Sequence, residues 1–197
     1  LAEPVSDGLN TFQVEYGNRT ITPWGGQHQS KVIQMHNGQL IEVFDRDANI
    51  YAHRSDDYGK TWDEPVLVAD LGKSELMGSA MQLANGDLIV LFFQYNHFTT
   101  TGCLQDCDAG LYMTRSTDLG RSWSTPEQLD TGWNYNVTYT NPIELANGDI
   151  VAPFHYAYTD DGAFRLSVMY STDQGLTWNK SESDLVVPGS GMEAGAT

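Results

Sequence analysis

Apolar and polar residues alternate along most of the chain in short runs that are interrupted by turn residues. Three stretches share one pattern: QMHNGQLIEVF at 34–44, QLANGDLIVLF at 82–92 and ELANGDIVAPF at 144–154. An Asn-Gly pair between two apolar runs is the strongest short signal for a tight β-hairpin. No segment keeps a helical period over about 11 residues. The pattern therefore predicts an all-β chain with almost no helix.

A second motif follows each of these hairpins and has the form Ser-x-Asp-x-Gly-x-Ser/Thr-Trp. It occurs as RSDDYGKTWDEP at 54–65, RSTDLGRSWSTP at 115–126 and YSTDQGLTWNKS at 170–181. The three serines, Ser55, Ser116 and Ser171, are 61 and 55 residues apart. Such a period indicates an internal structural repeat.

Each repeat reads as four strands. In the first unit the pattern predicts strands at about 30–36, 39–45, 49–55 and 65–70, and the later units repeat this at about 78–130 and 139–188. Four antiparallel strands per repeat describe a β-propeller blade, which stacks on neighbouring blades to bury its faces. The predicted division is an N-terminal segment (1–24), blade 1 (25–74), blade 2 (75–137), blade 3 (138–188) and the start of blade 4 (189–197).

The Ser-x-Asp motif is interpreted as a structural turn. Its hydroxyl and carboxylate can accept hydrogen bonds from backbone N–H groups, its glycine supplies a positive φ, and its tryptophan fills the wedge between blades. Three carboxylates at repeat spacing are better explained by structure than by catalysis. The residues concerned are Ser55, Asp57, Gly59, Trp62, Ser116, Asp118, Gly120, Trp123, Ser171, Asp173, Gly175 and Trp178.

The excess of acidic residues makes some classes of binding partner unfavourable. The chain has 26 acidic and 10 basic residues, a formal net charge of -16, which disfavours nucleic acid and anionic membranes. The opening LAEPVSDG reads as a mature end left after signal removal, and sequons at Asn18, Asn136 and Asn179 also favour a secreted glycoprotein. In that setting Cys103 and Cys107 are expected to form a loop disulfide and not a zinc site.

The repeated turns resemble the Asp boxes of the sialidase superfamily, also described as BNR-repeat proteins. This resemblance implies a six-bladed propeller of which the chain supplies about the first three blades. It also implies that the remaining blades lie on another chain, on sequence not present here, or on a second copy. The implied substrate is a glycan bound at the central mouth.

The resemblance also implies individual roles. Asp47 matches the region of the family's acid/base aspartate, with Asp45 and Arg46 beside it, and Glu193 in GSGMEAGAT matches the glutamate that polarises a nucleophilic tyrosine. That tyrosine would lie beyond residue 197. His28 stands where the family has a carboxylate-binding arginine, a change that imidazole does not compensate.

Further candidates come from the positions of polar and aromatic residues. Four residues near the ends of the second strands of blades 2 and 3 could stack on or bind a sugar, or they could simply cap the blade edge. Two more precede the innermost strands and could face the mouth, or they could be ordinary turn residues. These are Tyr95, His97, His155 and Tyr156, then Glu75 and Asn141. Trp133 and Tyr135 are possible cleft walls. Asp106 and Asp108 read as solvated loop residues, so no metal site or cofactor is predicted.

Three functions remain open from the sequence. The leading one is a secreted, exo-acting glycoside hydrolase whose sugar need not be sialic acid. A polysaccharide lyase would use His155 and Tyr156 to remove a proton next to a carboxylate, and its products would absorb in the ultraviolet. A non-catalytic carbohydrate-binding propeller would keep its affinity when Asp47 or Glu193 is replaced.

Overall fold

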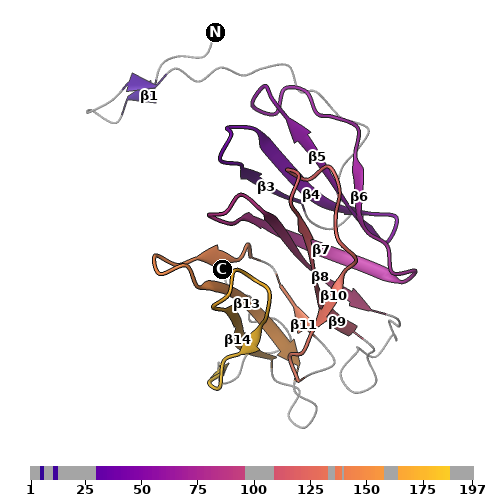
Figure 1. Cartoon of the computed structure of the whole chain (residues 1–197), viewed down its shortest axis with the longest axis vertical. Coiled ribbons are helices and arrows are strands. Elements are labelled where there is room, and N and C mark those ends of the chain that lie inside the picture. Colours follow the sequence, from indigo (N-terminus) through magenta and orange to yellow (C-terminus); the bar gives the residue numbers. More distant parts are fainter. Residues whose placement is uncertain are drawn as a thin grey trace.

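The computed structural model describes residues 5–6, 11–12, 30–95, 109–132, 136–138, 140–157 and 164–186. Over these residues all regular structure is β, and every strand pair is antiparallel. Three sheets fan out one beyond the other in the order of the sequence (Figure 1). The predicted all-β propeller architecture, of which this chain forms a part, is thus confirmed.

The first two sheets are four-stranded. Blade 1 contains β3 (Ser30–Gln34), β4 (Leu40–Arg46), β5 (Asn49–Ser55) and β6 (Val66–Ala69), paired in that order. Blade 2 repeats the order with β7 (Ser74–Gln82), β8 (Leu88–Tyr95), β9 (Ala109–Ser116) and β10 (Glu127–Leu129). A separate hairpin joins β1 (Val5–Ser6) to β2 (Thr11–Phe12).

Blade 3 has the same two central strands, but its inner and outer strands are each split. β13 (Ile150–Ala157) pairs with β14 (Phe164–Ser171); β11 (Asn136–Val137) and β12 (Ile143–Glu144) both pair with β13, and β15 (Asn179–Lys180) and β16 (Leu185–Val186) both pair with β14. Proline accounts for the inner split, because Pro142 and Pro153 lack the N–H that a continuous ladder needs. The Thr138 hydroxyl lies within 3.2 Å of the Pro153 carbonyl across this gap and donates a hydrogen bond.

The Asn-Gly pairs form hairpins by a type I turn followed by a glycine bulge. In blade 1 the Gly38 N–H donates to the Met35 carbonyl at 2.9 Å, and Gly38 then takes a φ of 88°. Gly86 and Gly148 repeat this geometry, with φ values of 95° and 86°. Only the glycine, not the asparagine, has a positive φ, as in the longer hairpin connections.

The three Ser-x-Asp turns have the geometry expected from their sequence. In blade 2, Ser116 Oγ accepts from the Gly120 N–H at 2.9 Å and donates to Asp118 Oδ1 at 2.7 Å, and Asp118 Oδ1 accepts from the Ser122 N–H at 2.9 Å. Hydrogen bonds, first from the Ser122 hydroxyl, hold the pKa of Asp118 at about 2. Blades 1 and 3 repeat these bonds. The carboxylates are therefore committed to the turns.

Two apolar clusters join the blades. One lies between blades 1 and 2 and is contacted by Trp123, and the other lies between blades 2 and 3 and is contacted by Trp178. Trp123 and Trp178 thus contact the apolar wedges between adjacent blades, as predicted for them. Phe44, Phe92 and Phe154 hold the same place in successive blades and are at most 2% exposed.

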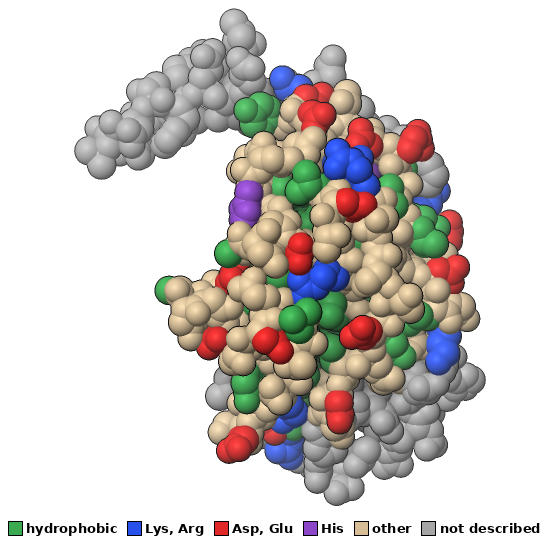
Figure 2. Space-filling model, in the orientation of Figure 1, with side chains coloured by type: hydrophobic (Ala, Val, Ile, Leu, Met, Phe, Trp, Pro, Cys, Tyr) green, Lys and Arg blue, Asp and Glu red, His purple; other side chains and the backbone are tan. Residues whose placement is uncertain are grey.

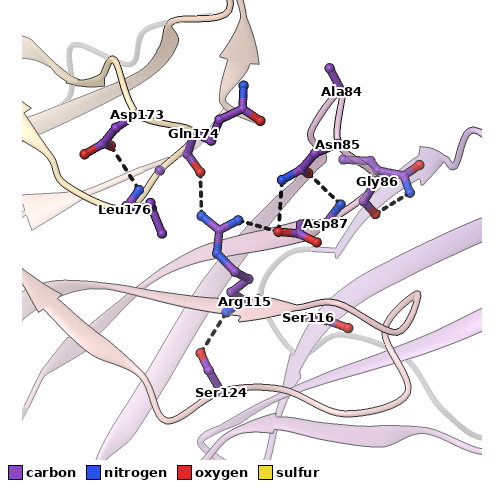
Figure 3. Close-up of polar contacts among 12 residues, drawn as sticks. Ala84, Asn85, Gly86, Asp87, Arg115, Ser116, Ser124, Asp173, Gln174 and Leu176 are labelled. Carbon is purple, nitrogen blue, oxygen red and sulfur yellow. Dashed lines mark hydrogen bonds and ion pairs between the residues drawn. The ribbon is translucent and has the colours of Figure 1, made fainter.

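Polar contacts repeat between blades as well. Gln82 Oε1 accepts from the His36 N–H of blade 1 at 2.6 Å, and Glu144 Oε2 accepts from the Ala84 N–H of blade 2 at 2.8 Å. Figure 3 shows a further bridge, in which Arg115 donates to Asp87 Oδ2 at 2.8 Å and to the Gln174 carbonyl in blade 3 at 2.5 Å. These contacts fix the angle between blades at the end that carries the Ser-x-Asp turns.

Alanine substitutions at two glycines test the packing of blade 2 on blade 1. Gly120 and Gly38 both have positive φ (79° and 88°), but a Cβ on Gly120 would lie 2.6 Å from Ile41 Cδ1 of blade 1, whereas a Cβ on Gly38 would meet nothing within 4 Å. We expect Gly120→Ala to lower the free energy of unfolding by about 2–4 kcal/mol and Gly38→Ala by about 1 kcal/mol. Urea denaturation measures both. Equal losses would contradict the blade 1–blade 2 packing.

Candidate functional site

The two ends of each blade carry different chemistry. Leu40 pairs with Ser55 at one end of the β4–β5 hairpin, and Arg46 pairs with Asn49 at the other. The Asn-Gly and Ser-x-Asp turns therefore share one end, and strands of this length place the opposite end roughly 20 Å away. Most of the sequence-predicted site residues that the structure describes lie at or near that opposite end: Asp45, Arg46, Asp47, Glu75, His155 and Tyr156.

Asp47 lies in a two-residue turn that closes the β4–β5 hairpin. Asp47 and Ala48 have φ values of 50° and 65°, which is the type I′ geometry that matches strand twist. Neither residue is glycine, so the turn holds two strained backbone positions, a feature that concentrates at functional sites. The Asp47 side chain is 73% exposed, and its Oδ2 lies 3.6 Å from Arg46 Nε. The turn presents a carboxylate and a guanidinium together.

The turn is anchored on blade 2. The Glu75 N–H donates to the Ala48 carbonyl at 3.0 Å, so the start of the innermost strand β7 fixes the position of the Asp47 turn. Asp45 lies two residues before Asp47 on the side of β4 that faces blade 2, and it is 0% exposed. Its carboxylate is therefore not presented to solvent, in contrast to that of Asp47.

Glu75 is a buried carboxyl group. It is 0% exposed, and neither carboxylate oxygen has a hydrogen-bond partner. Burial first, and the negative charge of Asp70 second, raise the pKa of Glu75; backbone N–H groups of Leu71 and Lys73 oppose part of the rise without reaching good hydrogen-bond geometry. Glu75 therefore holds a proton more strongly than an exposed glutamate does.

This environment gives a prediction with a defined pH window. Above pH 4.5, the ordinary pKa of a glutamate, Glu75 loses its proton in the unfolded chain but keeps it in the folded protein. Glu75 therefore makes the free energy of unfolding fall as the pH rises above 4.5. We expect Glu75→Gln to raise the free energy of unfolding at pH 7 by on the order of 1 kcal/mol and to have little effect near pH 4. Denaturation at several pH values measures this, with exposed Glu64→Gln as the control. A loss of stability at pH 7 would contradict the burial of an unpaired carboxyl.

His155 and Tyr156 are buried in blade 3 and not displayed at a surface. His155 is 3% exposed, and burial lowers its pKa to about 4, so the imidazole is neutral near pH 7. The Tyr156 hydroxyl donates to Asp184 Oδ2 at 2.5 Å, and Lys180 Nζ donates to Asp184 Oδ1 at 2.8 Å. Burial opposes ionisation of Asp184, but the bonds from Lys180 and Tyr156 outweigh it and lower the pKa. Tyr156, Lys180 and Asp184 tie β13 to the outer part of the blade.

Tyr95 of blade 2 and Tyr156 of blade 3 are not at equivalent positions of the repeat. Leu88 and Ile150 both pair with the serine of a Ser-x-Asp turn, Ser116 and Ser171. Counted from them, Tyr156 matches Gln94, which is 1% exposed, and Tyr95 matches Ala157.

Asn141 has an inter-blade contact. Its Oδ1 accepts from the Ala80 N–H of blade 2 at 3.1 Å. The side chain thus supports the junction between blades 2 and 3.

Several predicted residues lie outside the part of the chain that the structure describes. They are Asn18, His28, His97, Cys103, Asp106, Cys107, Asp108, Trp133, Tyr135 and Glu193, together with the side chains of Tyr95 and Asn136. Of the sequons, Asn179 is exposed on β15, whereas the Thr138 hydroxyl of the Asn136 sequon is buried.

The described residues lack both a metal-ligand cluster and a membrane-spanning helix. They contain no group of three His, Cys, Asp or Glu side chains arranged to hold a metal ion. Within the same residues, no helix long and apolar enough to cross a membrane is present. On the face drawn in Figure 2, acidic and basic side chains are interspersed and do not gather in one patch.

Sequence reasoning missed one polar pair. Glu42 Oε2 lies 2.7 Å from His53 Nε2 on the face of blade 1 turned away from blade 2, and the His53 side chain is 1% exposed. A signal was present in the repeat: Glu42 occupies the position of Val90 and Ala152, so it is a charge in an otherwise apolar register.

Comparison with known proteins agrees with this fold. The model of a BNR repeat-like domain matches residues 44–190. Similar solved structures include a Dyadobacter fermentans protein of unknown function (TM-score 0.65, 22% identity) and Trypanosoma rangeli sialidase in complex with the inhibitor DANA (0.62, 20%). A variant of NanB sialidase from Streptococcus pneumoniae is also similar (0.60, 15%).

The matches cover different shares of the chains. They cover 77%, 79% and 81% of this chain, but only 53%, 30% and 44% of the three structures. The chain therefore spans about half their length or less. No curated protein sequence matches it. The family match extends over most of the chain and includes the second and third Ser-x-Asp turns as well as the first. The chain belongs to the BNR repeat-like domain family.

Proposed function

We propose that the propeller to which these blades belong is a glycan-active enzyme, an exo-acting glycoside hydrolase working at the end that carries Asp47. The observation that supports this most directly is the turn itself. It projects an exposed carboxylate beside a guanidinium, on two strained non-glycine residues, and a backbone hydrogen bond from blade 2 anchors it. Rigid support of an exposed acid is what proton transfer requires.

In this proposal Asp47 exchanges a proton with the glycosidic oxygen. Arg46 keeps the carboxylate in place and can donate to substrate oxygens. Glu193 and a tyrosine beyond residue 197 would supply the nucleophile that the family resemblance implies. His28 stands at the position of the implied arginine, so the proposal covers glycosides in general and is not limited to sialosides.

The lyase alternative finds less support. It would need His155 and Tyr156 at an accessible surface, but they are 3% and 1% exposed, and the Tyr156 hydroxyl is bound to Asp184. A non-catalytic sugar-binding propeller remains the outcome that the experiment must separate from hydrolysis.

The proposal includes secretion and a completed ring. Asn179, exposed on β15, would carry an N-linked glycan. The remaining blades, on further sequence or another chain, would complete the mouth. Nucleic acid and membrane are not expected as partners, because of the net charge of -16.

The test is a substrate screen with the complete propeller. Aryl glycosides and reducing-end-labelled oligosaccharides would be incubated with it, and released monosaccharide and absorbance of unsaturated products would be measured together. Monosaccharide released from the non-reducing end supports the proposal. Unsaturated products would support the lyase, and binding without any product would support the non-catalytic propeller.

A further inference from the structure

A β-bulge in the innermost strand of blade 2 turns Glu75 toward blade 1. In β7, Met77 and Gly78 together oppose the single residue Phe92 of β8. Regular alternation from Ala80, which lies in the cluster between blades 1 and 2, would place Glu75 on the opposite face. The extra residue brings Glu75 onto the side that faces blade 1. Bulges of this kind re-aim side chains next to functional sites.

The bulge also lets the two blades approach each other closely. A Cβ on Gly78 would lie 2.8 Å from Val43 Cγ1 of blade 1. Nearer the Asp47 turn, the Glu75 N–H donates to the Ala48 carbonyl at 3.0 Å. Blades 1 and 2 are therefore in direct contact just behind the turn, along a seam that runs from Gly78 to Ala48.

The carboxyl group of Glu75 lies inside this seam. It is 0% exposed, and neither of its oxygens has a hydrogen-bond partner. Burial, and then the negative charge of Asp70, raises the pKa of Glu75. The neutral acid is therefore the form that fits the closed seam.

The charged neighbours of the seam do not pair with this carboxyl group. On the elements packed around β7, the described charged residues at this end are Lys31 on β3, Asp45 on β4, Arg46 and Asp47 in the turn, and Asp70 and Lys73 before β7. β8 has no charged residue, and in β5 His53 faces away from blade 2 while Arg54 lies at the other end. None of these groups gives an oxygen of Glu75 a hydrogen bond.

We propose that Glu75 is a positioning residue for glycoside hydrolysis: its neutral side chain keeps the seam closed and the Asp47 turn in place, and its ionisation releases the turn. This inference rests on the proposed function, in which Asp47 transfers the proton. Glu75 does not touch substrate, because it is fully buried. A carboxylate in the seam needs donors or water that the closed seam does not supply. Its hydration would separate the blades at the residue whose N–H holds Ala48.

The expected effect has a defined direction with pH. Below the raised pKa of Glu75 the carboxyl is neutral and the turn is anchored, and above this pKa the carboxylate forms and the anchor is lost. The alkaline limb of the pH profile of kcat/KM is therefore expected to follow the ionisation of Glu75. Removing that ionisation should extend activity to higher pH.

Kinetics of the complete propeller on the best substrate of the screen test this expectation. Glu75→Gln keeps the size of the side chain and the backbone N–H but cannot ionise. Its alkaline limb should move to higher pH, so that kcat/KM one pH unit above the wild-type midpoint rises by about three- to tenfold. Glu75→Asp, which still ionises, should not extend activity, and Glu64→Gln should leave the profile unchanged. An alkaline limb that stays in place in folded Glu75→Gln overturns the proposal.

Hydrogen exchange followed by mass spectrometry separates this inference from failure of the proposed function, because it needs no substrate. Protection of the segment 70–80, corrected for the intrinsic effect of pH on amide exchange, is expected to fall at least roughly fivefold between about pH 4 and about pH 8 in the wild type. In Glu75→Gln the protection should stay nearly constant. Protection that does not fall in the wild type, or that falls equally in Glu75→Gln, overturns the inference even if the propeller hydrolyses no glycoside.

Discussion

Replacing Asp47 by asparagine in the complete propeller is expected to lower kcat/KM for glycoside hydrolysis by about 100- to 10,000-fold. Asparagine keeps the size of the side chain and the tolerance of a positive φ, but it cannot transfer a proton. The loss should fall on kcat and leave KM nearly unchanged, because the turn and Arg46 remain. Steady-state kinetics on the best substrate of the screen measures this.

Two controls make the Asp47 result specific. Glu64→Gln removes an exposed carboxylate beside the first Ser-x-Asp turn, at the other end of blade 1, and is expected to leave kcat/KM unchanged. Circular dichroism would verify that Asp47→Asn keeps the fold. Wild-type kcat/KM in a folded Asp47→Asn protein would remove Asp47 from the mechanism and shift the assignment to another acid.

The largest expected loss of stability follows Phe92→Ala. Phe92 is 0% exposed in the cluster between blades 1 and 2, and its ring stacks on Tyr112 with 5.8 Å between centroids. Truncation leaves a cavity between two sheets that cannot easily collapse, so the free energy of unfolding should fall by about 3–5 kcal/mol. Guanidinium denaturation followed by tryptophan fluorescence measures it.

The matched control is Val32→Ala on β3. Val32 is 48% exposed, and no described strand lies against it, so its loss should change stability by less than about 1 kcal/mol. Similar effects of Phe92→Ala and Val32→Ala would mean that the blades do not stack as described.

The fold was predictable because the same local signals occur three times. Predicted strands at 30–36, 39–45, 49–55 and 65–70 correspond to β3, β4, β5 and β6, with ends displaced by at most two residues. The Ser-x-Asp turns are local motifs whose serine, aspartate and glycine interact with one another. Their hydrogen bonds could therefore be foreseen from the residues alone.

The candidate site was less predictable, because its properties depend on contacts between blades. Nothing local distinguishes Asp45, which is buried, from Asp47, which is exposed; the neighbouring blade and the turn decide this. The turn at Asp47 and Ala48 lacks the glycine that normally signals two consecutive positive φ values. The burial of Glu75, and the hydrogen bond from its N–H to Ala48, likewise join segments far apart in the sequence.

The split inner strand of blade 3 can be explained by prolines in the sequence, although the alternation of apolar and polar residues does not predict it. Pro142 lies directly before β12 and Pro153 lies in β13, and neither can donate an N–H to the inner ladder, which is split into β11 and β12. The sequence also placed His155 and Tyr156 at a mouth, whereas packing within blade 3 buries both. Alternation along a strand assigns a face to each residue, but it does not say what covers the strand end.

The most direct test of the central claim, that sugar binds at the Asp47 end of the blades, is a crystal structure of the complete propeller with the monosaccharide product of the screen. The account predicts sugar density at the central mouth, with a sugar oxygen within hydrogen-bond distance of Asp47 or Arg46. Density confined to the end that carries the Ser-x-Asp turns, or to the outer strands β15 and β16, would contradict it.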